Sequence, residues 1–496
     1  MESIGPVCLI TSPSVFLSDE RVFMSLGILK VAAVLETQKI SLEKLDLSGI
    51  ENYEEIMLAH ASRSEAECFG ITATTPQMPA ATKIAGVIHR AHPDAKIILG
   101  GPHVTLVNAA HKKELKRKVL GRAARAKDVL LCNFDILVAG DGEEAIFLAL
   151  DENTPKLIDA DDPKSHLFLD SQRLSLMPYP ARHLVDVDSY HYFIDGERAL
   201  SLIAQLGCPF ECGFCGGRAS PFLRRVRIRS IESIISEMKF MRETYGVKGF
   251  MLYDDELNVN KEMIKLMWAI RDLENQMGEE WKLRGFIKAQ LFTEEQAAAM
   301  REAGFCQILV GFESGSPRIL TNINKRATRE ENTRCLEIAK KYGIKVKALM
   351  SIGHPGESAE TVMETYEWLI NAKPDDFDVT IITTYPGTPY YDDAVFDEKT
   401  GAWIYTYGKT GDRLYGLEID YTKIAEYYKG NPEGDYQSFV YTDYLTADEL
   451  VKMRDFIERD IRQKLKIPFN PSVAAIRYEH SMGQAGLPKN ILKTVN

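Results

Sequence analysis

Short apolar runs alternate with helical patterns through the first 150 residues. The apolar runs have the length and β-branched content of buried strands, and the stretches between them repeat apolar residues at the spacing of an amphipathic helix. Such alternation is typical of parallel strands joined by crossover helices. We therefore predict a doubly wound, Rossmann-like α/β domain over residues 1–150. Its strands are expected at VCLITSP, ECFGITATT, KIILGGPH and DILVAGDG.

Three further segments follow this domain. Residues 151–195 are rich in proline and weakly periodic, which predicts a linker along the surface. Over residues 196–395 the alternation resumes with six repeats, which predict an incomplete (β/α) barrel. Residues 396–496 begin as irregular, aromatic-rich sequence and end in a long helical pattern, so we predict a mostly helical C-terminal region. The barrel strands are expected at LSLIAQLG, VKGFMLYD, LRGFIKA, CQILVGFE, IKVKALMSIG and DVTIITTY.

Composition excludes several classes of protein. Lys and Arg total 60 against 71 Asp and Glu, giving a net charge of −11, which argues against binding nucleic acid. No apolar run approaches the roughly 18 residues of a membrane-spanning helix, and the N-terminus lacks the pattern of a secretory signal. We expect a cytoplasmic protein with no membrane span. In such a reducing compartment, a tight cluster among the eight cysteines indicates metal or redox chemistry.

Three cysteines form such a cluster directly after the first barrel strand. Cys208, Cys212 and Cys215 lie in QLGCPFECGFCGGR, where their spacing lets three thiolates converge on one inorganic centre. A four-iron cubane held by three cysteines keeps one iron open to an external ligand. Two alternatives remain: a structural zinc site, which needs a fourth ligand such as His183 or His191, and a dithiol redox pair of Cys212 and Cys215.

The cysteine motif, with an aromatic residue before its last cysteine, resembles the cluster loop of radical S-adenosylmethionine (SAM) enzymes. Further stretches are similar to that superfamily in matching order, and they extend the resemblance over residues 200–391. The resemblance implies a 4Fe-4S cluster whose open iron chelates SAM and whose electron cleaves it to a 5′-deoxyadenosyl radical. The stretches are YDDE, GFESGS, NKRATREE, IGHPGES and YPGTPYY.

The same resemblance implies which residues contact SAM. Gly216 and Gly217 would let the backbone approach the methionyl amine closely. Lys288, which closes the third barrel strand, is expected at the SAM carboxylate. Each polar residue of this kind also has an ordinary interpretation as a satisfied strand-end group. Three residues at the ends of the fourth and fifth strands are expected near the ribose and adenine: Glu313, Ser314 and Gly353.

Small hydroxyls and glycines mark the strand ends of the N-terminal domain. Doubly wound sheets bind ligands beyond the carboxyl ends of their strands, and these residues suit a long flat ligand or a nucleotide tail. No GxGxxG follows the first strand, which disfavours a dinucleotide. In front of a radical SAM core, TATTPQ, LGGPH and AGDGEEAI resemble the cobalamin-binding domain of cobalamin-dependent radical SAM enzymes. The implied cobalamin contacts are Thr72, Thr74, Thr75, Gly100, Gly101, Pro102, His103, Gly140, Asp141, Gly142 and Glu143.

The DxHxxG motif that supplies a lower histidine ligand to cobalt in other cobalamin proteins is absent. We therefore predict that no histidine coordinates cobalt and that Gln77 or Met78 lies near the lower face. His103 is expected to pack against the nucleotide tail or to serve the turn rather than to act as a ligand. An alternative is a degenerate scaffold without a ligand, because threonine and glycine also serve ordinary turns.

The resemblance implies a cobalamin-dependent radical SAM methyltransferase acting on an unactivated carbon or phosphinate centre. One SAM would remethylate cob(I)alamin, and a second would generate the radical that activates the substrate. Expected partners are a small-molecule or peptide substrate and an external one-electron donor such as flavodoxin or ferredoxin. Two alternatives stay open: a cyclase or ring-rearranging oxidation with the same cofactors, and a non-catalytic cobalamin or iron–sulfur sensor.

Overall fold

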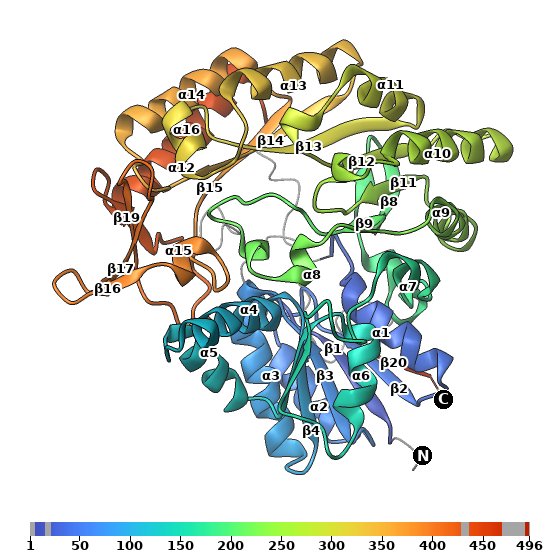
Figure 1. Ribbon diagram of the computed structural model, residues 1–496. Coiled ribbons are helices and arrows are strands. Elements are labelled where there is room, and N and C mark those ends of the chain that lie inside the picture. Colours follow the sequence, from blue (N-terminus) through green and yellow to red (C-terminus); the bar gives the residue numbers. More distant parts are fainter. Residues whose placement is uncertain (1–4, 15–20, 428–435, 469–491, 496) are drawn as a thin grey trace.

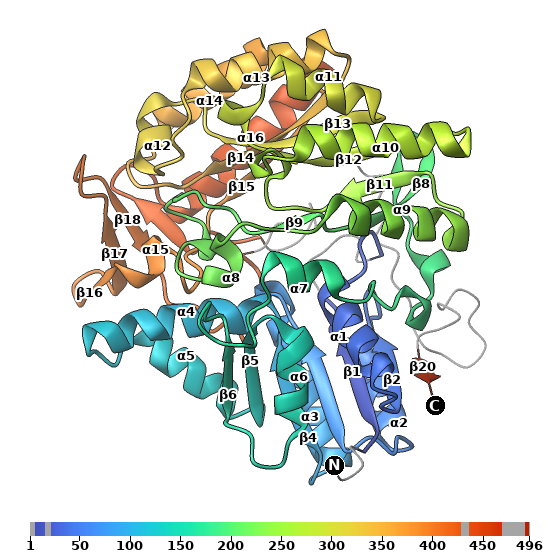
Figure 2. The same cartoon turned by 45° about the vertical axis from the view of Figure 1, so that its right-hand side comes forward.

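Two lobes stack on one another in the computed structural model, an N-terminal lobe and a barrel lobe (Figure 1). The structure describes residues 5–14, 21–427, 436–468 and 492–495. The segment that carries the three cysteines runs between the lobes, as Figure 2 shows from a second side. No helix of the described residues combines the length and the apolar character needed to cross a membrane.

The N-terminal lobe is the predicted doubly wound sheet. Its strands run in the order β20-β2-β1-β3-β4-β5-β6, with β2 to β6 parallel and β20 antiparallel to β2. Alternate residues of β1 face opposite sides, since Cys8 and Ile10 join one apolar cluster while Val7 and Leu9 join the other. The strands are β1 Val7–Thr11, β2 Leu42–Asp46, β3 Cys68–Thr72, β4 Lys96–Gly100, β5 Ile136–Gly140, β6 Leu157–Ala160 and β20 Leu492–Val495.

Helices cover both faces of this sheet (Figure 1). Strand β6 falls within the segment that we expected to be a linker, so the sheet extends further than the periodicity indicated. Its four residues, LIDA, are too short and too polar to stand out as a strand. The helices are α1 Leu26–Thr37, α2 Tyr53–Ala61, α3 Met78–Ala91, α4 Pro102–Arg117, α5 Arg122–Leu131 and α6 Gly142–Leu150.

The barrel lobe contains all six predicted strands as one curved parallel sheet, which confirms the incomplete barrel. Its order is β15-β14-β13-β12-β11-β8, and a short antiparallel strand, β7 Phe193–Ile194, adds one edge. The parallel strands are β8 Glu197–Leu202, β11 Gly249–Leu252, β12 Lys282–Ile287, β13 Phe305–Glu313, β14 Lys345–Ile352 and β15 Asp376–Ile381. The main helices are α9 Ile231–Tyr245, α10 Met263–Met277, α11 Glu294–Glu302, α13 Arg329–Lys341 and α14 Ala359–Ala372.

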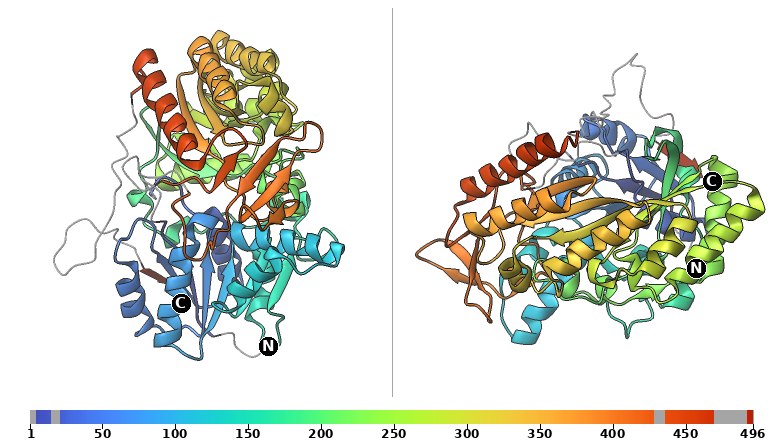
Figure 3. Two further views of the ribbon diagram at one scale, coloured as in Figure 1. Left: turned by 90° about the vertical axis from the view of Figure 1, so that its left-hand side faces the viewer. Right: turned by 90° about the horizontal axis from the view of Figure 1, so that it is seen from above.

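The C-terminal region ends in the predicted helix, α16 Ala447–Leu465, which lies along the outside of the barrel lobe (Figure 3). A four-stranded antiparallel sheet precedes it, which the irregular sequence did not indicate because its strands are short and aromatic. The strands are β16 Val395–Asp397, β17 Ala402–Thr406, β18 Arg413–Gly416 and β19 Val440–Thr442.

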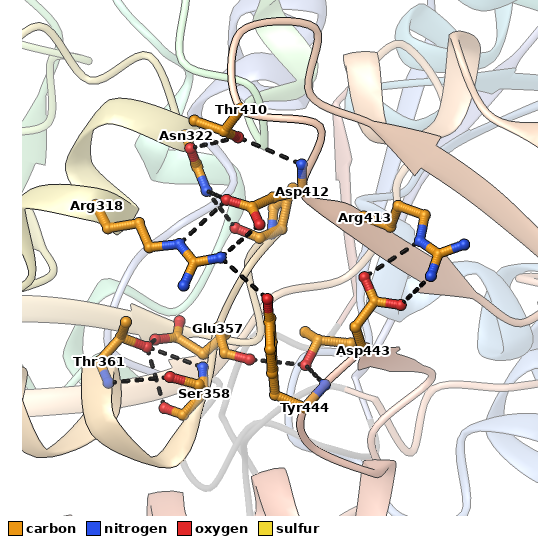
Figure 4. A network of polar contacts seen from close by, with 12 residues as sticks. Arg318, Asn322, Glu357, Ser358, Thr361, Thr410, Asp412, Arg413, Asp443 and Tyr444 are labelled. Carbon is orange, nitrogen blue, oxygen red and sulfur yellow. Dashed lines mark hydrogen bonds and ion pairs between the residues drawn. The ribbon is translucent and has the colours of Figure 1, made fainter.

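A polar network fastens this sheet to the barrel (Figure 4). Asp412, at the start of β18, accepts hydrogen bonds from Arg318 and Asn322 of helix α12 Pro317–Asn322. The hydroxyl of Thr442 in β19 donates to the carbonyl of Glu357, which follows β14. The C-terminal sheet is therefore held beside the ends of the barrel strands.

Candidate functional site

The cysteine loop lies between β9 Gln205–Leu206 and the short helix α8 Pro221–Arg224, where the two lobes meet (Figure 1). Cys212 is buried and Cys208 is half-buried. Desolvation raises the pKa of the Cys208 thiol to about 11. Cys215 is exposed as a residue, but desolvation of its sulfur, with the charges of Cys212 and Cys208, raises the pKa of its thiol to about 12. Three thiolates in one loop repel one another unless a cationic centre lies among them.

The sulfur spacing distinguishes between a cluster and a single ion. Among the described residues, the one group of three ligand atoms that lie within 4.8 Å of one another is Cys8, Glu43 and His60, so at least two sulfurs of the cysteine loop lie more than 4.8 Å apart. A zinc ion with Zn–S bonds of about 2.3 Å holds its sulfurs only about 3.8 Å apart. His183, a possible fourth zinc ligand, instead lies 2.8 Å from Glu36. The loop therefore fits an iron–sulfur cluster better than zinc.

Two acidic residues after β11 hold the chain that leads into the loop. Asp254 accepts from the backbone N–H groups of Ala204, at 2.7 Å, and Gln205, at 3.1 Å. Asp255 accepts from the N–H of Gly207 at 2.7 Å. Both residues lie in the YDDE stretch and had no predicted role; their place at the end of a barrel strand was the available signal.

Gly207 shows why the loop needs glycine before Cys208. Its φ is +88°, and a Cβ there would lie 2.0 Å from the carbonyl oxygen of Arg225. No other residue fits so close an approach.

A buried triad of charged side chains holds the backbone that leads from β8 to the cysteine loop. Glu237 of α9 lies 2.8 Å from Arg182 and 2.6 Å from Arg229, and all three side chains are buried. Arg182 also donates to the carbonyl of Ser201, and Arg229 donates to that of Ile203. The triad therefore fixes the backbone that connects β8 to the cysteine loop.

Lys288 is a buried ammonium beside the cysteine loop. Only 2% of the residue is exposed, and its Nζ lies 4.0 Å from the ring centroid of Phe210 within the loop. Burial and the nearby Lys325 ammonium lower the pKa of Lys288. Among the described ion pairs, none includes Lys288. Its position fits the expected contact with a carboxylate brought by a ligand.

A chain of buried polar groups runs from Glu313 towards the loop. Glu313 lies 2.9 Å from Lys325 and accepts from the Ser351 hydroxyl at 2.8 Å. Ser351 contacts Nε2 of His354 at 2.8 Å, and Nδ1 of His354 lies 3.4 Å from the Tyr390 hydroxyl. Burial lowers the pKa of His354 to about 4, so the imidazole is neutral.

This chain reaches the cysteine loop, because the ring of Phe214 lies 5.4 Å from that of His354. Glu313 was a predicted site residue, whereas Lys325 and His354 in the same chain of contacts were not predicted. Both lie in stretches that resembled the superfamily, and both follow barrel elements.

Other predicted SAM contacts have protein partners. The Ser314 hydroxyl bonds Thr365 of α14 at 2.9 Å. A Cβ on Gly216 would lie 2.7 Å from Leu106 of α4, so this glycine serves close packing between the lobes. A Cβ on Gly217 would lie 3.6 Å from the Cys215 sulfur, and one on Gly353 would meet Ile381 at 3.1 Å. Gly217 therefore lies next to the predicted cluster, whereas the Ser314 hydroxyl is already hydrogen-bonded to helix α14.

The ends of β3 and β4 in the N-terminal lobe carry small residues that are partly exposed. Thr72, Gly100 and Gly101 are half-buried, and Thr74 and Pro102 are exposed. A Cβ on Gly100 would have no atom nearer than 3.9 Å. No bulky side chain thus projects from these positions, which fits a flat ligand across the strand ends.

His103 is buried between the lobes and its Nδ1 lies 3.1 Å from the Thr75 hydroxyl. Burial lowers the pKa of His103 to about 4, and its ring centroid lies 5.8 Å from that of Tyr421. Gln77 donates to the carbonyl of Ser12 and accepts from Thr74. Met78 is fully buried. Gln77 therefore lies at the sheet edge with its amide already engaged.

The residues at the end of β5 contact other parts of the protein and are not exposed to a ligand. Asp141 is 2.6 Å from Arg227 and accepts from the N–H of Leu169. Glu143 lies 4.0 Å from Lys30, and a Cβ on Gly142 would lie 2.9 Å from Val31 of α1. Gly140 has a φ of +89°, and a Cβ there would lie 2.5 Å from the backbone after β6. These four predicted cobalamin contacts all have partners within the protein.

Comparison with known proteins identifies the same two parts. The family model of the radical SAM superfamily matches residues 202–369, and that of the B12 binding domain matches residues 15–131. An uncharacterized methyltransferase of Pyrococcus horikoshii is 29% identical over 335 residues, covering 67% of this chain and 70% of that protein. An anaerobic magnesium-protoporphyrin IX monomethyl ester cyclase of Rubrivivax gelatinosus is 24% identical, covering 73% of this chain and 63% of the cyclase. The chain thus spans less than two thirds of the cyclase.

Solved structures share the fold over most of this chain. The radical SAM methyltransferase TsrM of Kitasatospora setae, solved with cobalamin and a 4Fe-4S cluster, superposes with a TM-score of 0.62 at 16% identity, over 94% of this chain and 89% of that one. The cobalamin-dependent SAM radical enzyme OxsB, solved with aqua-cobalamin and SAM, gives a TM-score of 0.55 at 14% identity, over 94% of this chain and 62% of that one. The chain thus contains a radical SAM domain and a B12-binding domain, a combination that implies a 4Fe-4S cluster, SAM and cobalamin as cofactors.

Proposed function

We propose that the chain is a cobalamin-dependent radical SAM methyltransferase acting on an unactivated carbon or phosphinate centre of a small-molecule or peptide substrate. One observation carries the proposal: the cysteine loop lies where the strand ends of both lobes meet. Asp161, after β6, accepts from the Ser220 hydroxyl and from the N–H of Phe222, both at 2.7 Å. The loop after Cys215 is thereby fixed directly to the N-terminal lobe, which supports a close approach of the two expected cofactor sites.

Separate groups of residues in the barrel lobe would bind the cluster and SAM. Cys208, Cys212 and Cys215 would hold three irons of the cluster, and Lys288 would bind the SAM carboxylate. The buried chain of Lys325, Glu313, Ser351 and His354 would orient the rest of SAM. When bound, these cofactors supply one-electron cleavage of SAM and carriage of a methyl group.

The N-terminal lobe would hold cobalamin across Thr72, Thr74, Gly100, Gly101 and Pro102. His103 stays neutral, fully buried and bonded to Thr75, which supports a packing role and not ligation of cobalt. The lower face of cobalt would therefore carry no histidine. An electron donor such as flavodoxin or ferredoxin would reduce the cluster from outside.

A substrate-free experiment tests methyl transfer. The anoxic chain, reconstituted with iron, sulfide and hydroxocobalamin and reduced with titanium citrate, receives SAM with a deuterated methyl group. We expect trideuterated methylcobalamin and S-adenosylhomocysteine by mass spectrometry. Cys212→Ala should abolish 5′-deoxyadenosine release while cobalamin stays bound. Deoxyadenosine release without any labelled methylcobalamin would refute the methyltransferase assignment.

The second candidate is a cyclase or other oxidation with the same cofactors, favoured by the 24% identity to the Rubrivivax cyclase over 73% of this chain. The same assay separates the two, since a cyclase releases deoxyadenosine and consumes no methyl group. The mass of the product gives a second criterion once a substrate is known, because methylation adds one CH₂ and oxidation does not.

A further inference from the structure

A second group of possible metal ligands lies within the N-terminal lobe, apart from the cysteine loop. Cys8 and Glu43 are direct neighbours in the register of β1 and β2, so their side chains share one face of the sheet. His60, in the last turn of α2, lies over the same face. The ligand atoms of the three residues all lie within 4.8 Å of one another.

Both neighbours of His60 approach the same ring nitrogen. The Cys8 sulfur lies 3.4 Å from Nε2, and a carboxylate oxygen of Glu43 lies 2.9 Å from Nε2. A protonated Nε2 has one hydrogen and satisfies one of the two groups. An unprotonated Nε2 accepts from the thiol but then directs its lone pair at an anionic oxygen. Hydrogen bonding alone therefore satisfies only one of these two contacts.

A divalent cation at the shared position satisfies all three groups. With bonds of about 2.3 Å to sulfur and about 2.0 Å to nitrogen and oxygen, tetrahedral zinc separates sulfur from nitrogen by about 3.6 Å and nitrogen from oxygen by about 3.3 Å. The observed 3.4 and 2.9 Å differ from these values by only a few tenths of an ångström. The geometry needs only a small expansion to admit the ion.

The net charge and the burial of these three residues also favour a bound dication. Cys8 is fully buried, and His60 is 9% exposed. A thiolate, a carboxylate, a neutral imidazole and a dication add to zero charge, which avoids the cost of a buried net charge. The Ser64 hydroxyl donates to the same Glu43 oxygen at 2.8 Å, which is the kind of outer contact that orients a metal ligand.

We propose that Cys8, Glu43 and His60 bind one zinc ion, which joins α2 to the β1–β2 part of the sheet. One thiolate with imidazole and carboxylate is a donor set typical of zinc, and three protein ligands leave a fourth position for water. The ion has no part in the radical chemistry. Cys8 precedes the strand end at Thr11 by three residues, about 10 Å along the strand away from the barrel.

The test uses the anoxic holoenzyme, whose cluster thiols are occupied by iron. Zinc, iron and cobalt are measured together by mass spectrometry after exposure to zinc and dialysis. We expect about one zinc per chain in the wild type and at least a tenfold loss in Cys8→Ser and His60→Ala. Cys335→Ser is the matched control, because Cys335 is equally buried but lies in α13 of the barrel lobe.

X-ray absorption at the zinc edge of the wild type provides a second measurement that does not depend on how the variants fold. We expect one sulfur ligand with the remainder nitrogen or oxygen. A wild type with no more zinc than its Cys8→Ser variant would overturn the proposal. A zinc edge with three or four sulfurs would overturn it as well, because the ion would then occupy the cysteine loop.

Discussion

Glu237→Gln tests whether the buried charge triad holds the cysteine loop in place. The substitution keeps the size of the side chain and removes its charge. Arg182 and Arg229 then remain buried with no anion between them, at the positions where they also support the backbone of Ser201 and Ile203. The loss should therefore appear in the stability of the barrel lobe and in the capacity of the loop to hold iron.

Removing one partner of a buried ion pair costs about 3–5 kcal/mol, because the other charge stays buried. Glutamine still accepts one hydrogen bond, so we expect the lower end, about 3 kcal/mol. At about 2–4 °C per kcal/mol for a lobe of this size, the melting temperature should fall by about 6–12 °C. The two arginines lower the pKa of Glu237 against the effect of burial. The carboxylate contribution is present above the ordinary pKa of about 4.3 and is lost only below it, so the difference should stay constant from about pH 6 to pH 9.

Scanning calorimetry of the anoxic holoenzyme measures the effect, together with iron per chain. Glu243→Gln is the matched control, since Glu243 lies on the same helix, is mostly exposed, and forms only a surface pair with Lys239 at 3.8 Å. That variant should change stability by less than about 0.5 kcal/mol. Equal melting temperatures for the two variants would refute the role of the triad.

Three further substitutions have definite expected outcomes. Lys288→Met should leave the iron content unchanged and raise the Kd for SAM, measured by titration calorimetry, at least about 30-fold. The reason is that truncating a buried charge partner costs about 2 kcal/mol or more. A change in Kd below about threefold would contradict the assignment. Burial raises the pKa of Glu357 to about 7, so its stabilising contribution is complete below about pH 4.5 and is lost as pH rises through 7. Glu357→Gln should therefore raise the melting temperature at pH 8 and leave it unchanged at pH 4.5, and a decrease at pH 8 would count against this. The Gly207→Ala variant should lose most of its iron, because the added Cβ would clash with Arg225. The Gly196→Ala variant has the same φ of +88° but open space around it, so it should retain its iron. Equal losses of iron would show that backbone strain matters and the clash with Arg225 does not.

The sequence by itself determined the two-part architecture and the cysteine loop. Strands of four to nine residues alternate regularly with amphipathic helices, and hydrophobic periodicity is a local property that the chain displays before it folds. The three cysteines lie within eight consecutive positions, so their convergence needs no knowledge of tertiary contacts. Strands β2, β6 and β16 to β19 were not predicted, because their sequences are too short or too polar to stand out as buried strands.

Only the tertiary structure decided which polar strand-end residues pair with distant parts of the chain and which have no such partner among the described residues. Asp141 and Ser314 looked equivalent to Thr74 and Lys288 in the sequence, yet Asp141 pairs with Arg227, which is 86 residues away, and Ser314 with Thr365, which is 51 residues away. The same holds for Cys8, Glu43 and His60, which are scattered over two strands and a helix. Long-range partners of this kind depend on how the lobes and layers pack, and no local pattern of residues encodes them.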